Sequence, residues 1–262
     1  MALDDGGTSE HDLDPADPDR NRWRPVSRTR TYELVLDQVE EQIVRGELRV
    51  GDRLPSERDL ASLLGVSRAT VREAIRALEV QGVVQMATGS GPDSGTVVAA
   101  LTGQALTQLL RLHVGLANFT IQDIVEARVM LERWSVGLAI AHAQESDLER
   151  MRELLSGMDD PAVERPRFNE LDTAFHVAIA EAGGNRLVAD LTAAIRSSLR
   201  YVLLTAFVES PDWDNLANRL RAEHRGIYDA LAGGNSSVAA DRVESHIRVF
   251  FARFEPGRTP PG

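Results

Sequence analysis

Apolar residues recur at helical spacing in three consecutive stretches of the first hundred residues, and glycines separate these stretches. From Ser27 to Gly46 the apolar positions are three or four residues apart, which predicts an amphipathic helix that ends at the glycine. A second helix is predicted from Ser56, which has Asp59 at capping-box spacing, to Gly65. A short turn then leads into a third helix that begins at Arg68.

The pattern changes after Gly82. Two short runs rich in apolar residues predict strands over 83–87 and 96–100, and the glycine-rich segment 88–95 between them is typical of a hairpin loop. Three helices followed by a β-hairpin indicate a winged helix-turn-helix.

From Leu101 onward the sequence predicts helices alone. Thr120 and Asp123 repeat the capping-box spacing at the start of one of them. Such a bundle is large enough to hold a ligand pocket between its helices. The further helices are expected over residues 146–157, 165–182, 186–208, 214–232 and 236–255.

We therefore expect a mainly α-helical protein in three parts. These are an acidic, disordered tail over residues 1–24, a winged helix-turn-helix over 25–100 and an all-helical bundle over 101–258. The chain holds 29 basic and 40 acidic residues, for a net charge of −11, so it can bind nucleic acid or acidic lipid only locally. Residues 1–19 hold seven acids and no base, whereas residues 20–99 carry a net charge of +1, so a polyanion does not repel this middle segment.

Composition excludes several kinds of site. The chain has no cysteine, which excludes a disulfide framework, thiolate metal sites and cysteine nucleophiles. No stretch is long and apolar enough to span a bilayer, and acidic residues stand at the amino terminus where a secretory signal needs basic and apolar ones. We expect a cytoplasmic protein that does not enter a membrane.

The candidates for reading DNA lie at the start of the third predicted helix. A helix that enters the major groove needs long hydrogen-bond donors near its amino end, where Arg68, Thr70 and Arg72 stand. An arginine can donate to two acceptor atoms of guanine, and Ser67 suits a phosphate oxygen. Arg58 on the preceding helix suits either contact. From the residues alone, the alternative is that these arginines only solvate an exposed face.

Residues 54–83, LPSERDLASLLGVSRATVREAIRALEVQGV, closely resemble the DNA-binding signature of the GntR family of bacterial transcription regulators. The resemblance implies a winged helix that binds double-stranded DNA. It also places Arg58, Arg68, Thr70 and Arg72 on the family's DNA-contacting positions and Gly89 at the tip of the wing. The wing of this chain is longer than is usual in the family and holds no basic residue, which argues against contact with the minor groove.

Three histidines of the predicted bundle lie on apolar helix faces. Asp172 and His176 are four residues apart and share one face, and His224 and His246 lie on the apolar stripes of two later helices. A single histidine on such a face is more often a hydrogen-bonded core residue. Burying all four groups unpaired would be costly, so we expect them to bind a divalent ion. Neutral imidazoles and a carboxylate suit Zn(II), our first expectation, as well as Ni(II), Mn(II) and Fe(II).

The segment LDTAFHVAIA (171–180), followed by Glu223-His224 and Ser245-His246, resembles the FCD effector domain of one large GntR subfamily. The resemblance covers roughly residues 30–255, and it implies that the four residues named above are metal ligands. It also implies that Arg128 binds the carboxylate of an effector, whereas the residues alone leave a surface pair with Glu132 as the alternative. Asn185 could reach the pocket, although a helix cap explains it better.

These features predict a homodimeric transcription regulator that binds a short inverted repeat in double-stranded DNA. We expect a repressor that a small carboxylate effector releases from its operator. Two alternatives remain open. A metal-dependent hydrolase could use the same histidines, although no general base is identified beside them. The same regulator could instead hold a structural metal and take an acyl-type effector.

Overall fold

The computed structural model describes residues 29–87, 95–100 and 102–252. The predicted tail over residues 1–24, the tip of the wing with Gly89 and the end of the last predicted helix lie outside these ranges. Within them the chain divides into two compact units, one holding residues up to Leu78 together with 86–98 and the other holding the remainder. The exact domain limits remain a prediction.

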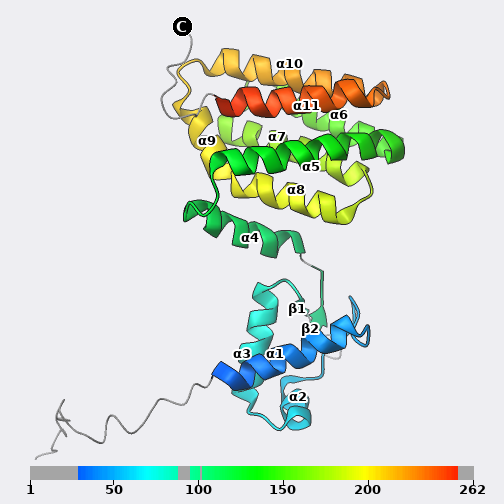
Figure 1. The fold of residues 1–262 in the computed structure, drawn as a ribbon, viewed down its shortest axis with the longest axis vertical. Coiled ribbons are helices and arrows are strands. Elements are labelled where there is room, and N and C mark those ends of the chain that lie inside the picture. The colour runs from blue at the N-terminus through cyan, green and yellow to red at the C-terminus, as the bar shows by residue number, and fades with distance from the viewer. Residues whose placement is uncertain (1–28, 88–94, 101, 253–262) are drawn as a thin grey trace, which may run out of the picture. The chain divides into compact units, whose positions relative to one another are not determined.

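The first unit is a winged helix-turn-helix (Figure 1). Ser56 begins its second helix by accepting a hydrogen bond from the amide N–H of Asp59, and Gly65 ends this helix with a φ of 66°, a left-handed conformation that costs glycine little. Backbone hydrogen bonds pair residues 51–54 with the second strand. The elements between residues 29 and 98 are α1 (Thr29–Val44), α2 (Glu57–Leu64), α3 (Arg68–Val80), β1 (Val84–Ala87) and β2 (Gly95–Val98).

The core of this unit orients α3. This helix buries Val71, Ala74, Ile75 and Leu78, none of them more than 5% exposed. Because these residues are three or four positions apart, they form one apolar stripe, and the opposite face of α3 is left in solvent.

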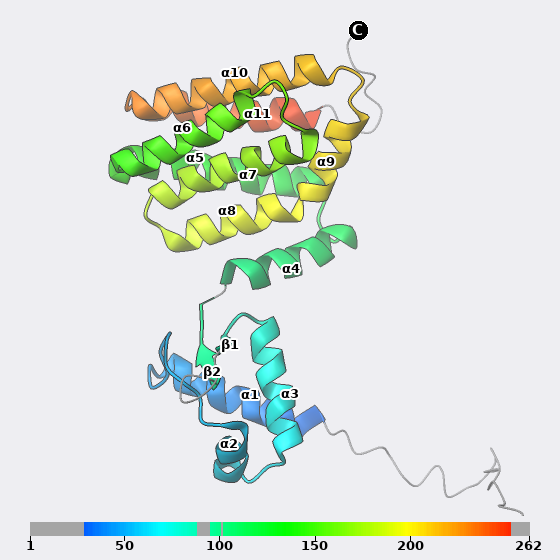
Figure 2. The ribbon, with the colours of Figure 1, turned by 180° about the vertical axis from the view of Figure 1, so that it is seen from behind.

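The second unit is a helical bundle (Figure 2). Its long helix α5 packs against α7, α8 and α11, while α10 packs against α11 and α6, and α4 lies on α8. Thr120 and Asp123 form the predicted capping box at the start of α5. The predicted fold class, mainly α with a winged helix-turn-helix and an all-helical bundle, is confirmed. The helices are α4 (Thr102–Gly115), α5 (Ile121–His142), α6 (Glu145–Asp159), α7 (Arg165–Ala182), α8 (Arg186–Ser198), α9 (Arg200–Glu209), α10 (Trp213–Ala232) and α11 (Ser236–Phe251).

Aromatic rings fill the bundle where α7, α9, α10 and α11 meet. Phe207 contacts Phe168, Trp213 and Phe250, and Phe168 also contacts Trp213, with ring centroids between 5.2 and 5.9 Å apart. Three of these contacts are edge-to-face and the Phe207–Trp213 contact is tilted, and such aromatic pairs add stability beyond the area they bury. They also hold Phe207 and Phe250 in place beside the site described below.

The single helix predicted over 186–208 is wrong, because the chain forms α8 and α9 with a bend of 45° between them. The break lies at Leu199, whose N–H is shared between the carbonyls of Ile195 and Arg196, and the Ser198 hydroxyl also donates to the Ile195 carbonyl. Serine side chains that bond the preceding turn weaken a helix in this way. No single described helix is long and apolar enough to span a membrane. Among the described helices, only the bent pair α8 and α9 meets these two criteria, and only when both helices are counted together.

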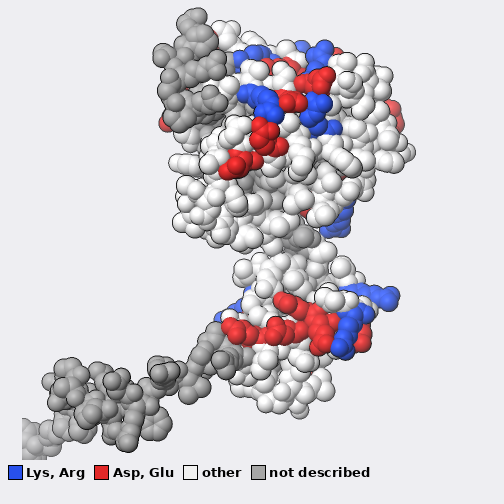
Figure 3. Space-filling model, in the orientation of Figure 1, with Lys and Arg blue, Asp and Glu red and all other residues white. Residues whose placement is uncertain are grey.

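Exposed charges of opposite sign alternate over α5 and α11 (Figure 3). Arg133 pairs with Asp241 and Glu244, and Arg248 pairs with Glu244 and with Glu126. We call these five residues the α5–α11 charge ladder. Exposed pairs contribute about 1 kcal/mol at most, so the ladder adds little to stability.

Candidate nucleic-acid interface and metal centre

The start of α3 carries the predicted DNA-reading residues in solvent. Arg68 and Arg72 are exposed on α3, Arg58 is exposed on α2, and Thr70 is half-buried. The amide N–H of Thr70 donates to Ser67 Oγ over 3.1 Å, and the two hydroxyl oxygens lie 2.8 Å apart. Ser67 therefore caps α3 and fixes the first turn from which these side chains extend.

Arg72 is held by a residue that the sequence analysis missed. Its Nη2 donates to Glu57 Oε2 over 3.0 Å, and its Nε lies 3.2 Å from the same oxygen. The hydrogen bond from Arg72 lowers the pKa of Glu57 and keeps the carboxylate charged. In the DNA-free protein Glu57 thus accepts hydrogen bonds from two nitrogen atoms of Arg72. A contact between these nitrogens and a base would have to replace those bonds. The pair joins two helices, so helical spacing could not reveal it.

Four predicted ligands come together from three helices of the bundle. Asp172 and His176 lie one turn apart on α7, His224 lies on α10 and His246 on α11. All four are buried, and each offers one ligand atom such that these atoms lie within 4.8 Å of one another. The centres of the three imidazole rings are 4.6 to 5.2 Å apart. An Asp/His₃ set of this size fits a divalent ion.

Unsatisfied nitrogen atoms support that fit. His176 Nε2 and both ring nitrogens of His224 are buried and make no hydrogen bond. His224 Nε2 does lie 2.9 Å from Asp172 Oδ1, but the contact lacks the direction of a hydrogen bond. Buried polar atoms are nearly always paired, and a metal ion would give these nitrogens the partner that they lack.

The surroundings hold three of the four candidate ligands in the protonation states that a metal requires. Burial lowers the pKa of His176 well below its usual range, and the charge of Arg196 lowers it further. Burial and then the neighbouring His224 do the same to the pKa of His246. Burial alone would raise the pKa of Asp172, but its contacts with His224 and Arg196 outweigh this and lower it well below the usual range. His176 and His246 are therefore held neutral and Asp172 ionised, which are the states in which these groups bind a metal.

Arg196 of α8 joins this cluster to α5, and the sequence analysis missed it. Its Nη1 donates to Asp172 Oδ2 over 3.0 Å, while its Nε and Nη2 donate to the two carboxylate oxygens of Glu132 over 3.0 and 2.7 Å. Its side chain is 1% exposed. The available signal was its position on the inward face of α8, three residues before the buried Leu199 and four after the buried Thr192.

Arg128 pairs with Glu132, as the alternative of a surface pair predicts. The pair is buried, however, and does not lie at the surface. Its Nε donates to Glu132 Oε1 over 2.9 Å, and both side chains are 4% exposed. Its guanidinium lies 5.3 Å from the centre of the Phe251 ring. Packing of α8 on α5 covers a pair that helical spacing alone suggests is solvated.

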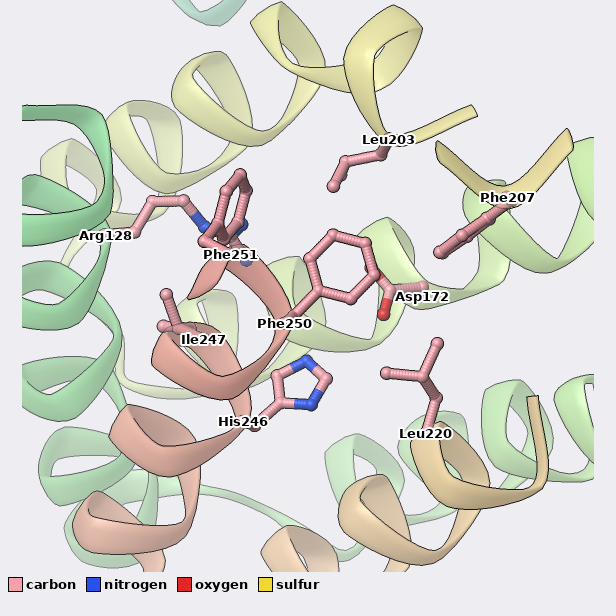
Figure 4. Close-up of a pocket in the computed structure, with 9 residues that line it drawn as sticks. All are labelled: Arg128, Asp172, Leu203, Phe207, Leu220, His246, Ile247, Phe250 and Phe251. Carbon is pink, nitrogen blue, oxygen red and sulfur yellow. The ribbon is translucent and has the colours of Figure 1, made fainter. Parts of the chain in front are cut away.

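A small cavity lies between Arg128 and the cluster (Figure 4). Arg128, Asp172 and His246 supply its polar wall. The cavity has a volume of about 10 Å³, which is room for about one water molecule. A larger guest therefore requires side chains to move. The rest of the wall is apolar and consists of Leu203, Phe207, Leu220, Ile247, Phe250 and Phe251.

Asn185 does not belong to this wall. Its side chain is exposed and accepts a hydrogen bond from the Val188 amide at the start of α8. The cap is therefore confirmed, and the placement of Asn185 in the effector pocket has no support from its position. Two glycines before a helix mark a turn and cap rather than a ligand site.

Comparison with known proteins identifies both units. A model of bacterial regulatory proteins of the gntR family matches residues 31–92, and a model of the FCD domain matches residues 123–249. The chain is 30% identical to the HTH-type transcriptional repressor NanR of Cronobacter sakazakii across 88% of each chain. It is also 32% identical to the HTH-type transcriptional regulator LutR of Bacillus subtilis, across 78% of this chain and 92% of LutR. This chain belongs to the GntR family. A solved GntR structure from Streptococcus agalactiae matches 85% of this GntR-family chain and 99% of its own length, with a TM-score of 0.60 and 26% identity.

Membership of the GntR family makes this protein a DNA-binding transcription regulator with an FCD domain. The family and these relatives are regulators and not enzymes, so the hydrolase alternative is dropped. GntR regulators bind DNA operators and commonly act as dimers.

The lowered pKa values of His176 and His246 predict how the stability of this GntR-family regulator depends on pH. Histidines of the unfolded chain titrate near a pKa of about 6.5, whereas these two take up protons only at lower pH in the folded protein. The unfolded chain therefore binds more protons as the pH falls below about 6.5, and stability is lost in that range. We expect the melting temperature of the metal-free protein to be level from pH 8 to 7 and to fall below pH 6.5. Calorimetry can test this, and the same curve in His176→Leu, which removes one titrating group, would contradict it.

Proposed function

We propose that this regulator is a repressor that a small carboxylate effector releases from its operator. The observation that carries the proposal is the buried cluster of Asp172, His176, His224 and His246, with nitrogens that lack partners. The name of NanR, a transcriptional repressor, favours repression over activation. We further propose that the protein acts in the cytoplasm, where its operator lies.

These four residues would hold the ion, with Zn(II) as our first expectation and Ni(II), Mn(II) or Fe(II) as alternatives. When bound, a divalent ion supplies positive charge and coordination positions for the oxygen atoms of an anion. The protein's own contribution is to keep His176 and His246 neutral, Asp172 ionised and water largely excluded.

Arg128 is proposed to bind the effector's carboxylate. It lines the cavity beside Asp172 and His246, and its charge would attract an anion in a setting with little water. Because the cavity admits about one water, the effector would enter only as the apolar side chains of α9 and α11 move apart. Movement of those helices gives binding a route to the rest of the bundle.

The regulator is proposed to act as a homodimer on a short inverted repeat, since one recognition helix spans only half a site. Effector binding would then change how the two recognition helices meet the two half-sites. A coupling of about 1–3 kcal/mol between effector and operator is typical of such systems.

The alternative of a structural metal with an acyl-type effector has the apolar cavity wall in its favour. The two versions differ in what metal removal does. A small carboxylate that binds the ion should lose its affinity in the metal-free protein, whereas an acyl chain held by the apolar wall should keep most of it.

Replacement of Arg68 or Arg72 by alanine tests the DNA-reading role. Since the chain has a net charge of −11, general attraction to DNA is weak, and loss of one base contact should reduce discrimination by about 1–3 kcal/mol, or about 5- to 150-fold. Binding to random DNA should fall much less. Gel-shift competition between operator and random DNA measures both affinities.

Arg76→Ala is the matched control, because Arg76 is exposed further along the same helix. Its loss should leave the preference for the operator unchanged. Equal losses on operator and random DNA in the Arg68 and Arg72 variants would show that these residues contact phosphate only.

A further inference from the structure

Two glutamates outside the four-residue cluster contact the outer nitrogen of two of its imidazoles. Glu223 Oε2 on α10 lies 2.8 Å from His246 Nδ1 on α11. Glu132 Oε2 on α5 lies 2.9 Å from His176 Nδ1 on α7. Each contact runs between two helices, and the two contacts share no residue.

These contacts select one form of each ring. A carboxylate only accepts hydrogen bonds, so the imidazole nitrogen beside it must carry the proton. In a neutral ring the other nitrogen, Nε2, then holds the free lone pair. His176 Nε2 is buried without a hydrogen-bond partner, as expected of an atom reserved for another ligand.

The two glutamates are held differently. Glu132 is buried and receives donors from both Arg128 and Arg196, so its position is fixed by the core. Glu223 is 25% exposed, and its other charged neighbour is Arg219 at 3.4 Å. Arg219 Nε and Nη2 are buried, but the Arg219 side chain as a whole is 32% exposed, so its charge still reaches solvent when Glu223 is replaced.

We infer that Glu223 and Glu132 are positioning residues of the metal centre, which keep His246 and His176 protonated on Nδ1 and aim Nε2 of each ring at the ion. This inference rests on the proposed metal site. Carboxylates that orient a metal-bound histidine fix its tautomer and raise its basicity, and their loss commonly lowers metal affinity about 10- to 100-fold.

Three variants of the full-length protein test the role of Glu223. Glu223→Ala removes the acceptor, Glu223→Gln keeps a carbonyl oxygen that can accept from Nδ1, and Glu126→Ala removes a carboxylate of the α5–α11 charge ladder that pairs with Arg248 and touches no imidazole. Competition with a chromophoric chelator gives the affinity of each protein for Zn(II). We expect a loss of about 10- to 100-fold in Glu223→Ala, recovery of most of it in Glu223→Gln, and no loss in Glu126→Ala.

Two readouts separate positioning from general stability. The metal-free Glu223→Ala protein should keep the helical content of the wild type and unfold in a single transition, so that its lower metal affinity is not a loss of the fold. In the zinc-loaded wild type, nitrogen NMR should show a proton on Nδ1 of His246 and His176.

The outcomes are distinct. Wild-type affinity for Zn(II) in Glu223→Ala, a loss in Glu223→Gln as large as in the alanine variant, or a proton on Nε2 would each overturn the positioning role. If the wild-type protein binds none of Zn(II), Ni(II), Mn(II) and Fe(II), the metal centre itself is wrong.

Discussion

Replacing Arg196 with methionine is expected to lower the free energy of unfolding of the helical bundle by about 3–5 kcal/mol. Arg196 is 1% exposed and donates to both Glu132 and Asp172, so its removal leaves carboxylate charge buried with fewer partners. Methionine fills much of the same volume, and the loss therefore reports the missing charge rather than a cavity. Urea unfolding of the metal-free protein measures it, and tryptophan fluorescence follows the bundle through the buried contacts of Trp213.

Arg200→Met provides the matched control for Arg196. Arg200 lies four residues later and pairs with Glu170, but its side chain is 56% exposed. An exposed pair contributes about 1 kcal/mol at most, so this variant should remain close to wild type. Equal losses in the two variants would show that the buried pairs of Arg196 add nothing beyond an ordinary surface contact.

His224→Ala is expected to remove both metal binding and the response to effector. The change takes away one of four ligands and leaves a void at a residue that is fully buried. The loss of metal affinity should exceed the 10- to 100-fold that is typical for residues that only orient a ligand. Metal content by elemental analysis should fall, while operator binding by the winged helix-turn-helix should largely persist.

Two further variants are compared with His224→Ala. His142→Ala changes an exposed histidine at the end of α5 and should keep both metal and response. Arg128→Ala should keep the metal, because Arg196 still donates to both oxygens of Glu132, but it should weaken binding of the carboxylate effector that releases the wild-type protein from its operator. Normal metal content in His224→Ala would eliminate the site, and unchanged effector affinity in Arg128→Ala would eliminate the proposed clamp.

The sequence predicts this fold well because its local signals agree with one another. The caps at Ser56 and Thr120 were both visible as residue spacings, and both form. The helix over 186–208 failed because the break at Leu199 depends on hydrogen bonds of the Ser198 side chain, which periodicity does not register.

The four cluster residues could be named from sequence, since they lie on inward faces and match the pattern of the FCD domain. Their partners could not be named in the same way. Arg196 meets Glu132 and Asp172 across three helices, and Glu57 meets Arg72 across two. Such pairs depend on how helices pack, and neither spacing nor composition along one helix contains that information.

The α5–α11 charge ladder and the buried pairs of Arg196 respond differently to ionic strength. At 1 M salt the Debye length is about 3 Å, so exposed pairs such as Arg133 with Asp241 are strongly screened. The pairs of Arg196 are out of reach of mobile ions. Salt also weakens contacts to phosphate in proportion to their number. A salt titration can therefore count the phosphate contacts of the winged helix-turn-helix while the interior of the helical bundle remains unchanged.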